Sequence, residues 1–305
     1  MSDQVRIVEV GPRDGLQNEK TPVGVEARIT FIEALVAAGL RTIEIGAFVS
    51  PKAIPQMVGS DEVLRRFATR SDGEFHVLVP NEKGYEVARS AGAKVIAVFG
   101  SASEGFSRAN INCSVAESIE RFKPVIARAK SDGIKVRGYI SCVLGCPYDG
   151  EIRPQAVVDV AKVLWDLGCY EVSLGDTIGV GTPKKARELL RAVAGHIPMA
   201  HLAMHFHDTY GQALANLYAG MEEGCRVIDS AAGGLGGCPY APGATGNVAT
   251  EDVVYMLEGM GIATGVVMTK LVEATNEISK LIGRQPVSRV VAALNAKKGR
   301  IGISE

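Results

Sequence analysis

The sequence predicts an α/β fold in which eight parallel strands and their intervening helices close into a (β/α)8 TIM barrel, followed by an additional C-terminal helical segment. Short β-rich runs alternate with longer runs of helical spacing along nearly the whole chain. This alternation predicts a parallel sheet, and eight repeats favour a closed barrel over an open, doubly wound sheet. With 305 residues, 47% of them hydrophobic, the chain is long enough to bury such a core.

The individual elements follow from local patterns. The predicted strands are Val5–Val10, Thr42–Ile45, Phe75–Val79, Val95–Phe99, Val136–Val143, Glu171–Leu174, Ala203–His207 and Val227–Ala231. Helical spacing is clearest in Glu26–Ala38, Asp61–Thr69, Val115–Ser131, Gln155–Leu167, Lys185–Val193 and Ala213–Glu222. Glycines stand where a helix should end before the next strand, at Gly39, Gly92, Gly133, Gly168 and Gly224.

The C-terminal helical region, about Asp252–Ile282, is too long for one closing helix. We expect it to split near Gly261–Gly265 into an eighth helix and an appended one, with the tail from Arg284 onward as a surface segment. No linker or low-complexity tract interrupts the pattern, which indicates one domain over residues 1–305 with an appended helical part at about 266–305. The appended helix around Lys270–Ile282 is compatible with packing against a second copy in a homodimer.

Composition excludes several classes of function. The 33 basic and 34 acidic residues are well mixed and give a net charge of −1, so we expect no nucleic-acid partner. No run of about 18 apolar residues occurs, which argues against a membrane span. The strand pattern begins at Val5 and leaves no room for a targeting peptide, so a cytoplasmic location is expected. The six cysteines include no Cys-x-x-Cys pair, which argues against a structural zinc site.

In a barrel of this kind, function sits at the carboxyl ends of the strands and in the loops that follow them. The segment Glu9–Glu19 follows the first strand and contains Arg13 and Asp14 between glycine and proline residues. A plain turn with a solvated ion pair is the simpler interpretation. The position at the active end of the barrel favours a functional one.

A second polar segment, Met204–Asp208, ends the seventh strand. Because strand side chains alternate, His205 and His207 point to the same face, about 6–7 Å apart along the strand. A single histidine is more often a satisfied core residue than a ligand. Two histidines at this spacing, at a catalytic strand end, favour a shared metal ion.

The third segment, Gly233–Asn247, follows the eighth strand and contains six glycines in fifteen residues. It is either a flexible connection or a mobile lid that carries Cys238 over the site. Strand eight neighbours strands seven and one in a closed barrel. The metal ligands we therefore predict are Asp14, His205, His207 and Asn247. Oxygen ligands favour Mg2+ or Mn2+, while the histidines keep Zn2+ or Fe2+ open.

Two further acidic residues stand on or after predicted strands. Glu44 lies in an apolar strand, where an ionised carboxylate needs a partner, and either an ion-pair role or a supporting role beside the metal would satisfy it. Asp176 ends the sixth strand and is either a helix cap or an active-site residue. Arg137 and Tyr139 share one face of the fifth strand, and Ser173 lies on the sixth.

These motifs resemble the hydroxymethylglutaryl-CoA lyase family. The resemblance is carried by Val10–Asn18, Gly46–Met57, His205–Gln212 and Gly233–Asp252, and it spans about residues 5–282. It implies cleavage of a small acyl-CoA substrate, 3-hydroxy-3-methylglutaryl-CoA, to acetyl-CoA and acetoacetate. It also implies Mg2+ or Mn2+ on Asp14, His205, His207 and Asn247, catalytic roles for Arg13 and Cys238, and supporting roles for Glu44 and Asp176. Asp14 and His205 both qualify as the base.

Two related enzyme classes and one non-enzyme class remain as alternatives. Claisen-type synthases and hydroxy-oxo-acid aldolases share the Arg-Asp-Gly and His-x-His motifs. The synthases typically carry a long C-terminal regulatory region, for which this sequence has no room, and the Gly-Leu-Gly-Gly-Cys-Pro-Tyr-Ala segment is more specific to the lyase. An inactive metal-binding scaffold would be marked by loss of a ligand or of that segment, and neither is lost.

Overall fold

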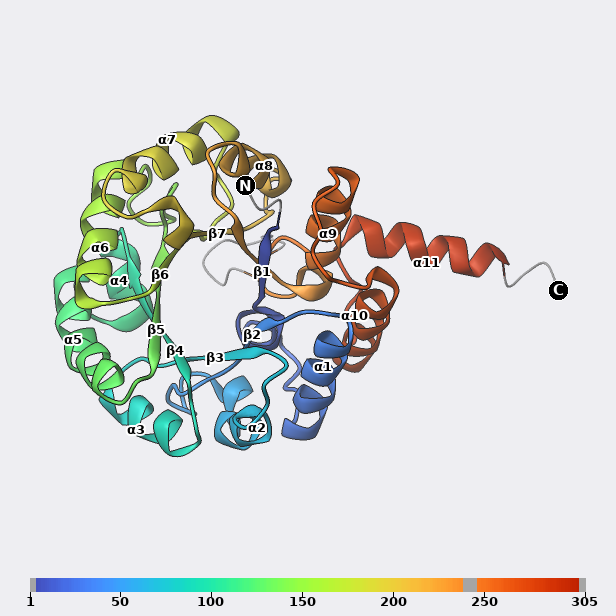
Figure 1. Cartoon of the computed structure of the whole chain (residues 1–305), viewed down its shortest axis with the longest axis horizontal. Coiled ribbons are helices and arrows are strands. Elements are labelled where there is room, and N and C mark those ends of the chain that lie inside the picture. Colours follow the sequence, from blue (N-terminus) through green and yellow to red (C-terminus); the bar gives the residue numbers. More distant parts are fainter. Residues whose placement is uncertain (1–3, 238–245, 302–305) are drawn as a thin grey trace.

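The computed structural model describes residues 4–237 and 246–301, with side chains to residue 297, and shows the barrel that the sequence predicts. All strands are parallel and follow one another around the barrel in chain order, and β1 pairs with β8 to close it (Figure 1). The strands are β1 (Arg6–Glu9), β2 (Thr42–Ala47), β3 (Glu74–Leu78), β4 (Val95–Ser101), β5 (Lys135–Ser141), β6 (Glu171–Asp176), β7 (Leu202–Phe206) and β8 (Val227–Ser230). The predicted fold class is therefore confirmed.

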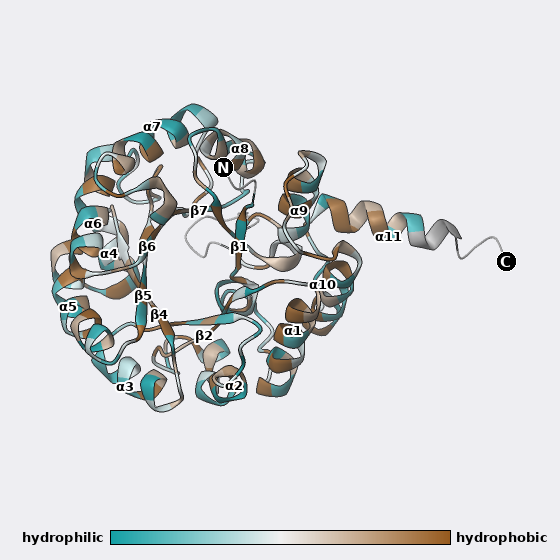
Figure 2. Cartoon of the chain, in the orientation of Figure 1, coloured by the Kyte–Doolittle hydropathy of each residue, from teal (hydrophilic) through white to brown (hydrophobic). Residues whose placement is uncertain are grey.

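The helices that surround the barrel include all those named in the sequence analysis and others that it did not name. They are α1 (Val25–Ala37), α2 (Ser60–Phe67), α3 (Glu82–Ser90), α4 (Glu104–Ile111), α5 (Val115–Ser131), α6 (Pro154–Leu167), α7 (Pro183–Ala194), α8 (Ala213–Glu222), α9 (Thr250–Gly259), α10 (Met268–Ile282) and α11 (Arg289–Ile301). Apolar and hydrophilic residues alternate along them, as expected for helices with one buried face (Figure 2). Two short turns, η1 (Gly11–Gly15) and η4 (Ala232–Gly234), follow β1 and β8 at the mouth.

The junction glycines adopt the conformation that the sequence pattern requires. The φ angles of Gly39, Gly92, Gly133, Gly168 and Gly224 lie between 70° and 107°. This left-handed region is nearly free of cost only for glycine, because a Cβ atom would approach the backbone too closely. The glycines therefore end the helices and turn the chain into the next strand.

The C-terminal region splits as predicted, and the tail departs from its prediction only at a few buried residues. Helix α9 ends before Gly261, and α10 packs against α1, so that α10 fills the outer ring between the last and first units. Most residues from 284 to 297 are exposed or half-buried, as expected for a surface segment, but Ser288 and Val291 are buried. Ser288 is buried and donates to Asp252 of α9 at 2.6 Å, while Val290 N donates to the same carboxylate at 3.0 Å. This capping contact starts α11, which then extends away from the barrel.

The centre of the barrel is polar. Arg137 of β5 and Asp229 of β8 are buried inside it and form two hydrogen bonds, at 2.9 and 2.7 Å. Arg137 also donates to the buried Glu171 of β6 at 2.7 Å. Barrels of this type are usually filled with branched apolar side chains. Charged residues are retained here at a desolvation cost, which indicates that the interior supports a site above it.

We predict that alanine at Gly39 destabilises the fold much more than alanine at Gly133. Both glycines have positive φ, which costs an alanine about 1–2 kcal/mol. At Gly39 a Cβ would also lie 2.1 Å from the carbonyl oxygen of Gly265, whereas at Gly133 it would meet nothing within 4 Å. Urea unfolding should give a loss of about 3 kcal/mol or more for Gly39→Ala. Equal losses in the two variants would contradict this account.

Candidate active site at the mouth of the barrel

The turn η1 aims Arg13 and Asp14 into the barrel mouth. It begins with Gly11, whose N–H donates to the side chain of Glu9 at 2.8 Å, and it closes with a hydrogen bond from Gly15 N to Val10 O. Glycine is required at position 15 because a Cβ there would lie 2.7 Å from the Cβ of Leu235. The loops after β1 and β8 therefore pack closely together beside Asp14.

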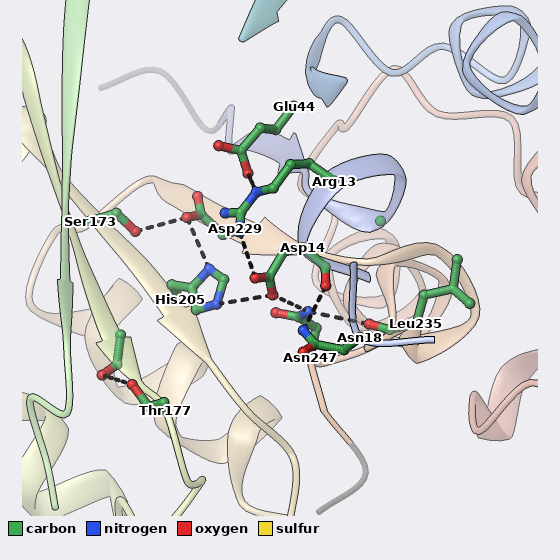
Figure 3. Close-up of polar contacts among 12 residues, drawn as sticks. Arg13, Asp14, Asn18, Glu44, Ser173, Thr177, His205, Asp229, Leu235 and Asn247 are labelled. Atoms are coloured by element: carbon green, nitrogen blue, oxygen red, sulfur yellow. Dashed lines mark hydrogen bonds and ion pairs between the residues drawn. The ribbon is translucent and has the colours of Figure 1, made fainter. Parts of the chain in front are cut away.

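Asp14, His205 and His207 form one group of potential metal ligands. Their ligand atoms all lie within 4.8 Å of one another, and the two imidazole rings are 5.4 Å apart between centroids. The alternation predicted for β7 thus places both histidines on the same side, facing the residue that follows β1. Figure 3 shows Asp14 between Arg13, His205 and Asn247 (Figure 3).

The histidine contacts fit a divalent ion. Nδ1 of His205 lies 3.3 Å from Oδ2 of Asp229, while its Nε2 faces Asp14 Oδ2 at 3.9 Å. A proton held on Nδ1 by a carboxylate leaves the Nε2 lone pair available to a metal. His207 Nδ1 is buried without a hydrogen-bond partner among the described residues. Burial and the neighbouring His205 lower the pKa of His207 to about 4, so its ring is neutral, as a ligand must be.

Asn247 lies where the sequence predicts it, beside the ligand group. An isolated antiparallel bridge joins it to His207, and its Nδ2 donates to Asp14 Oδ2 at 2.8 Å and to Leu235 O at 3.2 Å. A ligand role requires the amide oxygen, whereas the contact with Asp14 is made by the amide nitrogen. The ligand role of Asn247 therefore stays a prediction.

Arg13 is held between two carboxylates. Its Nε donates to Glu44 Oε2 at 2.6 Å, its Nη1 donates to Asp14 Oδ1 at 2.8 Å, and its guanidinium lies 5.7 Å from the ring centroid of Tyr139. Glu44 is fully buried and serves as the ion-pair partner that orients Arg13. Burial opposes the charge on Arg13, but Glu44 and then Asp14 hold its pKa above the ordinary value.

The same arginine controls the charge of Asp14. Burial acts to raise the pKa of this carboxyl group, but the positive charge of Arg13, together with smaller electrostatic contributions from the neighbouring histidines, outweighs burial and lowers it to about 2. Asp14 is therefore ionised at neutral pH. An anionic oxygen beside two imidazole rings is an arrangement that attracts a divalent cation.

Asp176 and Cys238 are placed differently from the ligand group. The Asp176 carboxylate accepts hydrogen bonds from Val180 N at 3.2 Å and Gly181 N at 2.8 Å, so it shapes the loop after β6. Burial raises its pKa to about 6. A supporting role is compatible with this position, because the adjacent Thr177 lines the cavity described below. Cys238 lies outside the described residues.

Asp229 is a site residue that sequence reasoning missed. Its carboxylate accepts hydrogen bonds from Arg137, from Ser173 Oγ at 2.7 Å and from Nδ1 of His205. It is buried at the centre of the barrel. Burial acts against its charge, but Arg137 holds its pKa well below the ordinary value. The signal was present in the sequence, since Asp229 is an acidic residue inside an apolar strand, as Glu44 is.

A cavity of about 350 Å³ opens beside the ligand group. Its polar wall includes Arg13, Asp14, Tyr139, His205 and His207. Its apolar wall includes Val49, Ile54, Leu78, Phe99, Phe106 and Ile111. A wider hollow near Arg6 and Lys135 lies at the opposite end of the barrel and contains none of the predicted ligands, so we place the site at the mouth.

Carboxylate and imidazole groups that converge on one point, at the loop-bearing end of a closed barrel, define the class of barrel enzymes with a candidate metal site. Within this class the chain belongs to the HMGL-like family, whose model matches residues 4–278.

Several named relatives match nearly the full length. A 3-hydroxy-3-isohexenylglutaryl-CoA/hydroxy-methylglutaryl-CoA lyase from Pseudomonas aeruginosa is 57% identical over 294 residues, which are 96% of this chain and 98% of the relative. A hydroxymethylglutaryl-CoA lyase from Pseudomonas mevalonii is 53% identical over 97% of this chain and 98% of its own. The crystal structure of hydroxymethylglutaryl-CoA lyase from Pseudomonas aeruginosa matches with a TM-score of 0.95 at 56% identity, covering 97% and 99% of the two chains.

In the part of the chain that the structure describes, none of the helices combines the length and the apolar character needed to cross a bilayer.

We predict that Asp229→Asn weakens Mn2+ binding about 10- to 100-fold, because His205 loses the anionic partner that orients it. Calorimetric titration without substrate measures this directly, and circular dichroism checks that the variant is folded. Glu74→Gln is the matched control. Glu74 pairs with His76 and Lys135 at the far end of the barrel interior, so its loss should leave Mn2+ affinity unchanged. The same affinity in both variants would rule out this role of Asp229.

Proposed function

We propose that this protein cleaves 3-hydroxy-3-methylglutaryl-CoA to acetyl-CoA and acetoacetate with the help of a bound Mg2+ or Mn2+. The observation that carries the proposal is the convergence of Asp14, His205 and His207 beside Arg13 and next to a cavity. The full-length similarity to proteins named as hydroxymethylglutaryl-CoA lyases supports the choice of substrate. It also favours a lyase over the synthase and aldolase alternatives, and the intact ligand group argues against an inactive scaffold.

The ion would be held by Asp14, His205 and His207, with Asn247 as a proposed fourth ligand. When bound, a divalent ion supplies Lewis acidity that lowers the pKa of a substrate hydroxyl group. The hydroxyl proton then passes to a neighbouring base. Asp14 and His205 are the two candidates.

Bond cleavage moves charge toward Arg13. Loss of the hydroxyl proton turns C3 into a carbonyl carbon, the C2–C3 bond breaks, and its electron pair forms the enolate of the thioester. Arg13 lines the cavity and carries a permanent positive charge, so it is suited to stabilise the enolate oxygen. Glu44 and Asp14 hold the guanidinium in place before substrate arrives.

The enolate must gain a proton at C2 to become acetyl-CoA. We propose Cys238 as the donor. Its neighbour in the sequence, Gly237, lines the cavity, which supports this assignment. A homodimer and a cytoplasmic location, both expected from the sequence, stay predictions.

The apolar wall of the cavity favours a second, broader activity. A C3 methyl group needs little apolar surface, yet Leu78, Phe99 and Phe106 together with the loop after β2 supply a wall of several large side chains. The Pseudomonas aeruginosa relative is named for both a methyl and an isohexenyl substituent at this position. We therefore propose that 3-hydroxyglutaryl-CoA esters with a longer apolar C3 substituent are also substrates.

The first experiment is a coupled assay for acetoacetate from 3-hydroxy-3-methylglutaryl-CoA after EDTA treatment. We expect no activity without metal and recovery on adding Mg2+ or Mn2+, because the ligands then regain their ion. A parallel experiment measures acetyl-CoA release from 3-hydroxy-3-isohexenylglutaryl-CoA. Absence of cleavage with Mn2+ demonstrably bound would refute the proposed reaction. Cleavage of 3-hydroxy-3-methylglutaryl-CoA alone, without cleavage of the isohexenyl substrate, would refute the broader activity.

We predict that Arg13→Lys and Cys238→Ala each lower kcat by about 100-fold or more, with smaller effects on KM. Lysine cannot keep the paired contacts of Arg13 with Glu44 and Asp14 and also face the cavity. Matched controls are Arg65→Lys on the exposed surface of α2 and Cys169→Ala in the core, neither of which should change turnover. A variant with wild-type kcat would remove that residue from the mechanism.

A further inference from the structure

An ion pair between the segment after η1 and the segment after α10 binds the backbone of the loop after β8. Arg284, just after α10, donates to the carbonyl oxygen of Gly236 at 3.0 Å and also forms an ion pair with Glu19, which follows η1. The Glu19 carboxylate in turn accepts a hydrogen bond from Gly236 N at 3.5 Å. Both polar groups of Gly236 are therefore bound by one ion pair.

This ion pair is not an ordinary surface contact. The Glu19 side chain is 9% exposed and that of Arg284 30% exposed, so solvent screens their interaction only in part. The segment that carries Arg284 is anchored a few residues later. Val287 N donates to Gly233 O at 3.0 Å, and a Cβ on Gly234 would lie 2.3 Å from the Val287 side chain. The chain between α10 and α11 thus packs directly on the loop after β8.

Gly236 lies next to the ligand group. Its φ is +113°, and a Cβ at this position would lie 2.9 Å from Nδ2 of Asn247. The preceding carbonyl, Leu235 O, accepts from that same nitrogen, which also contacts Asp14. The following residue, Gly237, lines the cavity. A shift of Gly236 would therefore displace Asn247 relative to Asp14 and move one wall of the cavity.

We propose that Arg284, acting with Glu19, is a positioning residue for the reaction proposed above. It does not touch the substrate. It holds Gly236 so that Asn247 and Gly237 keep their places beside Asp14 and the cavity, and it thereby makes the segment after the barrel part of the active site. This inference rests on the proposed function for its kinetic test, but its metal-binding test is independent of the reaction.

The test compares Arg284→Met, Arg284→Lys and the control Arg65→Met. Methionine removes the charge and the donor at similar length, whereas lysine keeps both. Arg65 belongs to an exposed ion pair with Asp61 on α2, far from the mouth. We expect Arg284→Met to lower kcat/KM about tenfold or more, because small displacements at a reacting centre are costly. Arg284→Lys should recover most of this loss, and Arg65→Met should show none.

Two further measurements separate positioning from folding and from the choice of reaction. The Tm of Arg284→Met should stay within about 4 °C of that of Arg65→Met. Direct Mn2+ titration without substrate should show weaker binding in Arg284→Met only. Should Arg284→Met not fold, Arg284→Gln replaces it, since its shorter, neutral side chain removes the ion pair with Glu19 and cannot reproduce the contact of the guanidinium group with Gly236 O.

A kinetic loss that lysine rescues, with Tm preserved, supports the positioning role. Wild-type kcat/KM in Arg284→Met, or an equal loss in Arg284→Lys, overturns it. Should the wild-type protein not cleave 3-hydroxy-3-methylglutaryl-CoA, the proposed function fails by itself. Mn2+ affinity then decides, and equal affinity in Arg284→Met and Arg65→Met overturns the role of Arg284.

Discussion

The ion pair between Arg137 and Asp229, buried at the centre of the barrel, is the interaction on which the site depends. Neither charge has access to water, and removing one partner of such a pair typically costs about 3–5 kcal/mol. Arg137 spans the barrel from β5 to β8 and also binds Glu171 of β6. The anionic Asp229 that results faces His205, so the charge balance of the interior determines which nitrogen of that histidine is presented at the mouth.

A second level of organisation joins the loops that carry the ligand group. Glu9, at the end of β1, accepts hydrogen bonds from Gly11 N before Asp14 and from Ala232 N after β8. Glu251, at the start of α9, accepts from Gly233 N. Both carboxyl groups are buried, and burial raises the pKa of each to about 7. The contacts of Glu9 join the first and last loops of the barrel, and that of Glu251 joins the last loop to α9, so residues from the two ends of the chain form one mouth.

The segment beyond the barrel completes this arrangement. A surface tail would contribute little to a site, but the chain between α10 and α11 is held by Asp252 on one side and by the loop after β8 on the other. Arg284 consequently reaches Gly236 and Glu19. The ligand group is thus surrounded by preorganised contacts from three directions, namely the barrel interior, the joined loops and the C-terminal segment. Such preorganisation is what electrostatic stabilisation of a developing negative charge requires.

The sequence by itself determined the barrel, the positions of its strands to within two residues, and the common face of His205 and His207, because these features follow from local periodicity and from glycine. It also identified Asp14 and Arg13, since polar residues after a barrel strand share one end of the fold. Only the tertiary structure decided which charged side chains form ion pairs with one another. Arg137 and Asp229 are 92 residues apart, and Glu19 and Arg284 are 265 residues apart. Local patterns carry no information on which buried charges meet, because that depends on how the closed barrel brings distant strands and loops together.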